Sequence, residues 1–468
     1  MHITEPEKKI PVVCETDVVV CGGGPAGFCA AIASAREGAK TVLLEQYGFL
    51  GGAYTKSGIN GIGGWQHDLN CQPLIDGIPG EIMKRMADNN AADPYAVNRA
   101  FNSVEKVPDY INYEGLGCIY INTTPEYFKI LADEMVEEAG VSVFYHTSAS
   151  APIIDENILK GVIIESKSGR EAIIAKTVID CTGDGDIAFK SGASYEIGRK
   201  SDGACQPHTM LFTVGNTGDI YLCYDKNNPE TDVELLVRGR YKGAVAEARK
   251  RGEIKYNPND IFCSATPVNN YFQSVKNINF TRIQNLSGVD REELTQAEII
   301  GRKQVKEGLA FMRKYIKNCE DACLVGIPPV IGIRESRRIM GDYILTKDDI
   351  EKGTRFYDVI ARGIYLMDIH NPTEVGKPSV LQKLKQPYDI PYRCLLPKGI
   401  ENLLVAGRCI SGDSEALSSY RIQSHCMAMG EAAGRAAALA ARTECSVRDI
   451  NVKQLQKTLK KAGVNIGR

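Results

Sequence analysis

Residues 17–45 read DVVVCGGGPAGFCAAIASAREGAKTVLLE, and this stretch decides the fold that we predict. Its apolar, β-branched start predicts a strand over Asp17–Cys21, and its middle predicts a helix over about Pro25–Glu37. A second apolar run predicts a strand over Thr41–Glu45. The glycines between the first strand and the helix follow the pattern G-x-G-x-x-G. This order of strand, turn, helix and second strand is typical of the unit that binds a dinucleotide.

Each glycine of the turn has its own physical role. Gly22 lets the chain turn sharply, Gly24 lets the backbone approach a pyrophosphate, and Gly27 lets the helix pack closely on the strand. Pro25 and Ala26 open the helix, whose free N–H groups and positive dipole end suit phosphate groups.

Glu45 ends the second strand at the position of a carboxylate that binds ribose hydroxyls. A tight turn without a ligand is the alternative interpretation of the glycines. Because Glu45 follows the glycines at the spacing expected for a ribose-binding acid, we favour dinucleotide binding.

Length and composition limit the class of protein. A chain of 468 residues exceeds one ordinary core, so we expect two domains. The net charge of -2 gives no electrostatic reason to bind nucleic acid or an anionic membrane surface. No apolar run reaches the roughly 18 residues that span a bilayer. The start of the chain has no apolar signal-peptide region, so we expect a cytoplasmic protein.

The cysteines do not indicate a metal site or a disulfide framework. The sequence has 15 of them, an odd number without C-x-x-C spacing, which suits a reducing compartment. Cys319 and Cys323 form the tightest pair, but no histidine lies nearby to complete a site. We therefore expect no bound metal.

Two further stretches of the first region bear on the ligand. Residues 46–65 are rich in glycine, including Gly51 and Gly52, and predict a loop whose backbone lies against a flat ligand. A linker is the alternative. Gly183 and Asp184 follow an apolar strand, at the strand end where open α/β sheets bind ligands.

The pattern of the chain changes twice. From about residue 188 to 387 it becomes mixed, with strands at Thr209–Val214 and Phe272–Phe280 and helices at Val233–Arg251 and Asp290–Tyr315. After Pro391 the earlier character returns, with a strand at Leu403–Ala406, a turn to Gly412 and a helix over about Ser418–Ala441. Small residues repeat along that helix, so we expect it to pack very closely on a neighbour. These expectations assign residues 1–187 and 388–468 to one domain and residues 188–387 to an inserted domain.

Three segments together resemble a known family: GGGPAG at 22–27 with Glu45, VIDCTGD at 178–184, and LVAGRCISGD at 404–413. They are similar to the three FAD signatures of glutathione-reductase-like flavoproteins. The whole chain looks like the FAD-dependent oxidoreductases that are distantly similar to fumarate reductase flavoproteins. The resemblance implies an α/β fold: a Rossmann-like FAD-binding domain of two chain segments, with an inserted α+β substrate domain.

The resemblance also implies how FAD is held. The first glycine turn would bind the pyrophosphate, Glu45 the adenosine ribose, and Asp413 the ribityl chain. The last helix would point its N-terminus at the pyrimidine ring of the flavin. Further residues expected in the FAD site are Gly51, Gly52, Gly183, Asp184, Arg408, Gly412 and Arg421.

The layout favours FAD over NAD, because a second Gly-Asp turn lies far downstream, after the inserted segment. The sequence contains one G-x-G-x-x-G and no C-x-x-C, so we expect no separate NAD(P)H site and no disulfide relay. Electrons would pass directly between the flavin and a small-molecule substrate, or a carrier partner would deliver them.

Arg334, His370 and His208 are the candidate catalytic residues. If residues 331–339 form a strand, Arg334, Ser336 and Arg338 share one face. Arg334 would then bind a substrate carboxylate or stabilise negative charge on the reduced flavin. A structural Arg–Glu pair is the alternative. An imidazole at either histidine position would exchange protons, or else serve a structural role.

We therefore expect an oxidoreductase that transfers hydride between flavin N5 and a carboxylate or a sugar-like alcohol. A fumarate-type or enoate reductase fed by an electron carrier is one alternative. A flavin-binding subunit of a larger assembly is another, and a homo-oligomer is compatible with both.

Overall fold

The computed structural model describes residues 2–4, 6–102, 119–217, 242–255, 263–265, 275–316, 318–373 and 379–467. Within them, seven strands form the central sheet, in the order β5-β2-β1-β8-β7-β6 with β19 beside β8. Strand β1 (Val12–Cys21) pairs in parallel with β2 (Thr41–Leu44) and with β8 (Gly169–Asp180), and β2 pairs in parallel with β5 (Ser142–Phe144). This parallel core confirms the predicted α/β class.

Strand β8 joins the two ends of the chain in one sheet. Along its first half it pairs antiparallel with β7 (Ile158–Ser166), which pairs in turn with β6 (Ser148–Asp155). Along its last residues it pairs in parallel with β19 (Leu403–Val405). The downstream segment therefore lies beside the first glycine turn.

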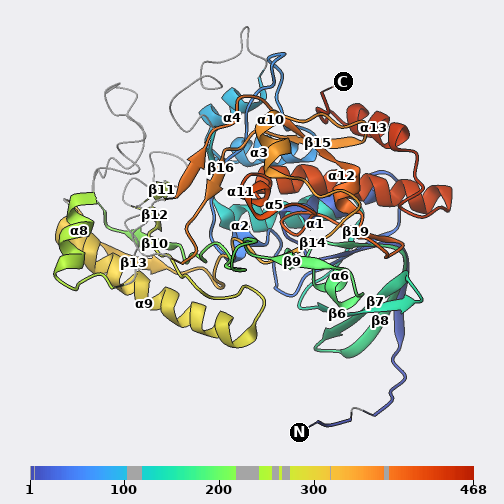
Figure 1. Cartoon of the computed structure of the whole chain (residues 1–468), viewed down its shortest axis with the longest axis horizontal. Coiled ribbons are helices and arrows are strands. Elements are labelled where there is room, and N and C mark those ends of the chain that lie inside the picture. The colour runs from blue at the N-terminus through green and yellow to red at the C-terminus, as the bar shows by residue number, and fades with distance from the viewer. Residues whose placement is uncertain are drawn as a thin grey trace.

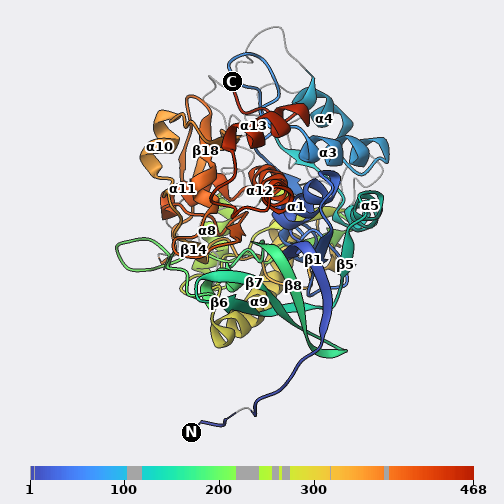
Figure 2. The same cartoon turned by 90° about the vertical axis from the view of Figure 1, so that its right-hand side faces the viewer.

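Helices α1 (Pro25–Arg36) and α12 (Gln423–Thr443) lie side by side over this sheet (Figure 2). A Cβ atom at Gly430 would lie 2.0 Å from the carbonyl oxygen of Ala26, and one at Gly434 would lie 2.1 Å from that of Ala30. Only glycine allows this approach, so the close packing predicted from the small residues is confirmed.

The predicted helix over Ser418–Ala441 is wrong in one respect, because the chain breaks there into two helices. Helix α11 (Ser414–Tyr420) begins at Asp413, whose carboxylate accepts the N–H of Ala416 at 2.6 Å. Ile422 has extended backbone angles and precedes α12. The break gives α12 a free N-terminus of its own.

A second, antiparallel sheet lies to one side of the molecule (left in Figure 1). Within the described residues it contains four strands, which pack with helices α8 (Lys242–Lys250) and α9 (Arg291–Tyr315) around a separate apolar core. Asp290 caps α9 by accepting the N–H groups of Glu292 and Glu293 at 2.9 Å each, and this helix confirms the prediction. Part of the predicted helix Val233–Arg251 lies outside the described residues. The elements are β11 (Cys263–Ala265), β12 (Lys276–Asn279), β10 (Phe212–Gly215), β13 (Cys323–Gly326), α8 (Lys242–Lys250) and α9 (Arg291–Tyr315).

Residues 331–339 do not form one continuous strand, because Arg337–Ile339 pair as β14 with β9 (Tyr195–Ile197), while Gly332 forms only an isolated bridge with Thr209. Arg334 and Arg338 therefore do not share a strand face. The buried Arg–Glu brace considered above exists, but between Arg338 and Glu335, whose Nη1 and Oε1 atoms lie 2.7 Å apart.

Apolar residues between Ile339 and Leu384 pack in the core of the central sheet, so the domain boundary near residue 387 stays a prediction.

Among the described residues, no helix combines the length and the apolar composition that a membrane crossing needs. The remaining elements are α2 (Ala53–Lys56), β3 (Gly61–Ile62), α3 (Ile78–Asp88), α4 (Pro94–Phe101), β4 (Ile121–Asn122), α5 (Pro125–Glu138), α6 (Asp186–Lys190), α10 (Lys347–Lys352), β15 (Val359–Gly363), β16 (Met367–Ile369), β17 (Val380–Gln382), β18 (Tyr388–Pro391), the 3-10 turn Tyr392–Leu395 and α13 (Val452–Lys461).

Candidate functional site

A cavity of about 620 Å³ extends from the first glycine turn to the second sheet. The residues that line it come from the N-terminal segment, the C-terminal segment and the residues between them. Of the residues predicted for the site, those on its wall are Gly22, Gly24, Pro25, Ala26, Glu45, Gly52, Gly183, Asp184, Arg334, His370, Arg408 and Arg421.

The glycine turn has the geometry that its sequence predicts. Gly22 has a φ of +99°, and a Cβ at Gly27 would lie 1.8 Å from the carbonyl oxygen of Gly22. A Cβ at Gly52 would lie 2.7 Å from the Cα of Gly24, so the glycine-rich loop lies directly against the turn. Gly24 precedes α1 without a side-chain cap. The first N–H groups of α1 are therefore available to a phosphate at this end of the cavity.

Glu45 is buried beside this turn. Its carboxylate accepts the backbone N–H of Gly23 at 2.8 Å and that of Tyr47 at 3.0 Å. Burial raises the pKa of Glu45, although these two hydrogen bonds oppose the shift. The acid is thus held rigidly at the wall of the cavity, at the position expected for a ribose partner.

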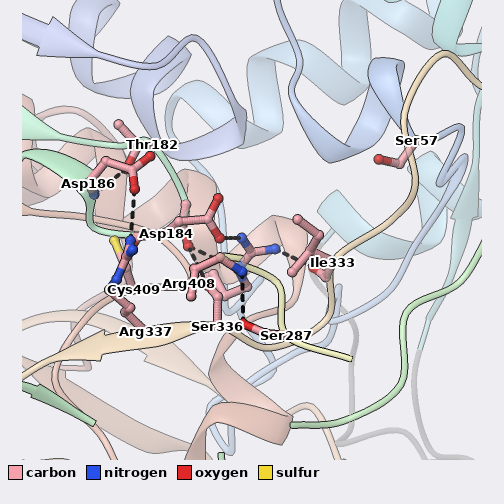
Figure 3. Close-up of polar contacts among 12 residues, drawn as sticks. Ser57, Thr182, Asp184, Asp186, Ser287, Ile333, Ser336, Arg337, Arg408 and Cys409 are labelled. Carbon is pink, nitrogen blue, oxygen red and sulfur yellow. Dashed lines mark hydrogen bonds and ion pairs between the residues drawn. The ribbon is translucent and has the colours of Figure 1, made fainter. Parts of the chain in front are cut away.

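Arg408 and Asp184 bind each other at the next part of the wall (Figure 3). Arg408 donates from Nε to the carbonyl oxygen of Gly183 at 3.0 Å, and from Nη1 to that of Ile333. Arg337 donates to Asp186 at 2.8 Å. These pairs connect the strand ends of β8 and β19 to the segment that carries Arg334.

Gln423 lies at the free N-terminus of α12. Its Nε2 donates to the carbonyl oxygen of Ile59 at 3.0 Å, while its Oε1 is buried and has no hydrogen-bond partner among the described residues. Helix α12 has no side-chain cap. An open acceptor beside open N–H donors fits the alternating donors and acceptors of a flavin pyrimidine ring.

Gly27, Gly51, Gly412 and Asp413 are not among the residues that line the cavity. The carboxylate of Asp413 accepts the N–H of Ala416 and, at 2.8 Å, the N–H of Lys347. Its contacts are thus those of a helix cap, and its role toward the ribityl chain stays a prediction.

His370 lies at the far end of the cavity between two polar partners. Its Nε2 is 3.0 Å from Oδ2 of Asp368, and its Nδ1 is 2.7 Å from Oγ of Ser379. Burial, together with the guanidinium of Arg334, lowers the pKa of His370 to about 3. The neutral ring then donates from Nε2 to Asp368 and accepts from the hydroxyl of Ser379.

Asp368 carries the negative charge of this cluster. Burial alone would raise its pKa, but His370, Arg421 and Arg334 outweigh burial and hold the pKa well below its usual range. Nη2 of Arg421 lies 3.7 Å from the Asp368 carboxylate and donates to the Asp368 carbonyl oxygen at 3.2 Å.

Arg334 donates to the carbonyl oxygen of Pro207. Burial and the neighbouring cations Arg282 and Arg421 lower its pKa. Arg282 also lines the cavity, and its Nη1 donates to Asn279 and to the Thr281 carbonyl oxygen, each at 2.7 Å.

His208 is buried and does not line the cavity. Its backbone exchanges two hydrogen bonds with Ile283, at 2.9 and 3.0 Å. Burial lowers its pKa to about 4. Its catalytic role stays a prediction, and the contacts described here are structural.

Among the cavity-lining residues that sequence reasoning missed, four carry charged or hydroxyl groups near the predicted residues: Lys56, Arg282, Asp368 and Ser379. Asp368 could have been predicted from the sequence, because it lies two residues before His370, and residues at this spacing lie on the same side of an extended strand. Nothing in the local sequence marks the other three. In the described part of the chain, no cluster of three or more histidine, cysteine or acidic residues could hold a metal ion.

Among solved structures, the chain is similar to a geranylgeranyl bacteriochlorophyll reductase-like protein from Thermoplasma acidophilum. The identity is 12%, the TM-score is 0.44, and the match covers 96% of this chain and 83% of that one. For p-nitrophenol 4-monooxygenase from Pseudomonas putida, the identity is 10% and the TM-score 0.46, with coverages of 95% and 84%.

Among curated proteins, the chain is similar to thiamine thiazole synthases. That of Sulfolobus acidocaldarius is 30% identical over 219 residues, which cover 44% of this chain and 71% of the relative. That of Saccharolobus solfataricus is 29% identical over 262 residues, covering 51% and 85%. A family model described as FAD dependent oxidoreductase matches residues 17–459. With the glycine turn and the cavity in place, this nearly complete match shows that the chain belongs to the FAD-dependent oxidoreductase family.

Proposed function

We propose that this oxidoreductase acts on a small polar molecule, a carboxylate or a sugar-like alcohol, bound at the Arg334–His370 end of the cavity. The observation that supports the proposal is the continuity of the cavity from Gly22 and Gly24 to Arg334 and His370. FAD, when bound, supplies hydride transfer at its N5 atom. The protein supplies binding, orientation and proton exchange.

The residues at the first end of the cavity fit FAD. The turn at Gly22 and Gly24 and the uncapped start of α1 suit the pyrophosphate, and Glu45 suits the adenosine ribose. The start of α12 and the open Oε1 of Gln423 suit the flavin ring. These contacts come from both ends of the chain, which is the arrangement that a long cofactor needs.

His370, Asp368 and Ser379 are positioned to move a proton at the other end. Asp368 holds Nε2–H of His370, so Nδ1 is free to accept the hydroxyl proton of Ser379. Ser379 can then take a proton from a substrate O–H or return one to it. Arg334 would orient a substrate carboxylate through its planar fork of donors.

The same residues would serve the reverse direction, in which a carrier protein delivers electrons and the substrate is an enoate. Arg334 would hold the carboxylate of the enoate, and Ser379 would donate the proton. In one direction the substrate reduces the flavin, and in the other an enoate reoxidises the reduced flavin. Two assays, one for each of these changes, therefore separate the two directions.

The test begins with FAD-loaded protein under anaerobic conditions and a panel of small carboxylates and polyols. Substrate oxidation predicts bleaching of the flavin band near about 450 nm. The enoate alternative predicts instead that dithionite-reduced protein is reoxidised by enoates. Protein that gains no flavin absorbance with added FAD would refute the whole proposal, whereas FAD-loaded protein inert toward both panels would refute the assigned substrates.

A further inference from the structure

We infer that the substrate carries a carboxylate and a second oxygen, as a hydroxyl or an oxo group, and that Arg421 and Thr209 contact these two groups. The inference rests on the proposed function, because it specifies which groups are carried by the molecule at the Arg334–His370 end of the cavity. Arg421 was predicted for the FAD site, and Thr209 was not predicted for any site.

The hydroxyl of Thr209 is an open hydrogen-bonding group at the cavity wall. Thr209 lines the cavity, although only 4% of the residue is exposed. Its Oγ1 is buried and has no hydrogen-bond partner among the described residues. Buried polar atoms in proteins are nearly always hydrogen-bonded, so this hydroxyl fits a polar atom of a ligand in the cavity.

The backbone of Thr209 is already paired, and this pairing fixes the position of the hydroxyl. Thr209 exchanges two backbone hydrogen bonds with Gly332, at 2.8 and 3.0 Å. Two residues beyond Gly332, Arg334 donates to the carbonyl oxygen of Pro207, which lies two residues before Thr209. The two segments therefore lie side by side, and the Thr209 hydroxyl lies at the Arg334 end of the cavity.

The residues that follow Thr209 show that packing does not require a hydroxyl here. Side chains of an extended chain alternate between its two faces. Thr209 and Leu211 line the cavity, whereas Met210 and Phe212 pack in the apolar core of the second sheet. Leu211 shows that an apolar side chain suits this wall. The hydroxyl at position 209 therefore indicates a polar group on the ligand.

Arg421 provides a second open group at the same end. Its Nη2 donates to the carbonyl oxygen of Asp368 at 3.2 Å and lies 3.7 Å from the Asp368 carboxylate. Its Nε is buried and has no hydrogen-bond partner in the described part of the chain, and Arg421 lines the cavity. A guanidinium nitrogen only donates, and it pairs best with carboxylate oxygens. This Nε therefore fits a carboxylate oxygen of the ligand.

The two open groups together select a class of molecule. A threonine hydroxyl both donates and accepts, so it can bind an alcohol or a carbonyl oxygen. Hydroxycarboxylates and oxocarboxylates carry this oxygen and a carboxylate in one molecule. A simple fatty acid lacks the second oxygen, and a polyol lacks the carboxylate. Either of these would leave one buried group of the site unpaired, which is costly.

The experiment is a titration of the oxidised, FAD-saturated protein under anaerobic conditions with acids that differ in one oxygen. Lactate and pyruvate are compared with propionate, malate is compared with succinate, and glycerol is the reference without a carboxylate. The Kd is read from the shift of the flavin absorbance band, or from the concentration dependence of its bleaching. We expect at least one oxygen-substituted acid to bind about tenfold or more tightly than its unsubstituted partner and than glycerol. Lactate against pyruvate distinguishes a hydroxyl from an oxo group.

Thr209→Val and Arg421→Lys are the test variants. Valine has the shape of threonine without its hydroxyl, so we expect Thr209→Val to remove the preference for the substituted acid. Its Tm without ligand should be at least that of the wild type, because the buried hydroxyl has no partner to lose. Lysine keeps the charge of Arg421 but not its fork of donors. Arg421→Lys should therefore weaken all the acids by about tenfold and keep the preference.

Thr213→Val is the matched control. Thr213 lies on β10, is half-buried and is not among the residues that line the cavity. We expect this control to bind each acid as the wild type does. FAD affinity is measured in every variant, so a misfolded protein is recognised directly.

Equal binding of the substituted and unsubstituted acids by the wild type would overturn the inference and leave the proposed carboxylate oxidoreductase intact. Failure of every acid to bind would refute the assigned carboxylate substrates as well. A Thr209→Val protein that keeps the preference but binds FAD more weakly would assign the hydroxyl to the flavin and so overturn the inference. Unchanged binding of all the acids by Arg421→Lys would overturn the role of Arg421.

Discussion

Replacing Gly430 by alanine probes the contact that brings the two ends of the chain together. A Cβ at this position would lie 2.0 Å from the carbonyl oxygen of Ala26, and Cβ atoms essentially never come within 3.0 Å of such an atom. The two helices must therefore separate by at least about 1 Å. Because a backbone atom opposes the new methyl group, no side-chain rotation can relieve the clash.

The magnitude follows from two opposing terms. Overpacking of this kind costs about 3 kcal/mol, at the upper end of its usual range. Alanine regains about 1 kcal/mol through its higher helix propensity. We expect a net loss of about 2 kcal/mol, or a Tm lower by about 2 °C for a chain of 468 residues. Since Ala26 lines the cavity, FAD affinity should fall as well.

The assay is thermal and urea unfolding of the apo and FAD-loaded proteins. Gly243→Ala is the matched control, because a Cβ at Gly243 in α8 would meet no atom within 4 Å. We expect that control to be neutral or stabilised by up to about 1 kcal/mol. A Gly430→Ala protein as stable as the control, with unchanged FAD affinity, would refute the reasoning.

Three other predictions concern His425, Lys56 and Ser379. Burial lowers the pKa of His425 to about 4, so the unfolded chain binds this proton first as the pH falls below about 6.5. The contribution of neutral His425 to the free energy of unfolding is complete above pH 6.5, and about 2 kcal/mol of it is lost by pH 5. The free energy of unfolding of His425→Gln, measured with urea, should therefore fall by about 2 kcal/mol less than that of the wild type over this pH range. Lys56 lines the cavity near Glu45 and Asp184, and its ammonium group lies 5.3 Å from the centroid of the Tyr47 ring. Lys56→Met should raise the Kd for FAD by about tenfold or more, more than for riboflavin, while Lys398→Met should not. Ser379→Ala should slow flavin reduction by a substrate about 100-fold, remove its solvent isotope effect and leave FAD binding unchanged; a rate like that of the wild type would exclude Ser379 from the proton path.

The nucleotide-binding half of the fold could be predicted because its signals are local. Gly22 has a positive φ, and a Cβ at Gly27 would clash with the carbonyl oxygen of Gly22, so the turn is visible in any window that contains these glycines. The small residues of α12 likewise indicated a close neighbour. That the neighbour is α1 depends on β19 joining the sheet beside β8, a long-range pairing that no local pattern contains.

The predictions failed where tertiary contacts override local periodicity. Residues 331–336 form no strand beyond the isolated bridge of Gly332 with Thr209. Arg334, Glu335 and Arg408 bind neighbouring backbone groups there instead. Arg282, Asp368 and Ser379 come from different elements and meet only in the folded chain. The role of Asp413 toward the ribityl chain stays a prediction, and its contacts with Ala416 and Lys347 are those of a helix cap.

A crystal structure of the FAD-saturated protein tests the central claim most directly. Our account predicts continuous cofactor density, with the pyrophosphate at Gly22–Gly24 and the flavin ring at Gln423, facing Arg334 and His370. Density for the flavin ring outside this cavity, or contacts with only one of the two chain segments, would contradict the account.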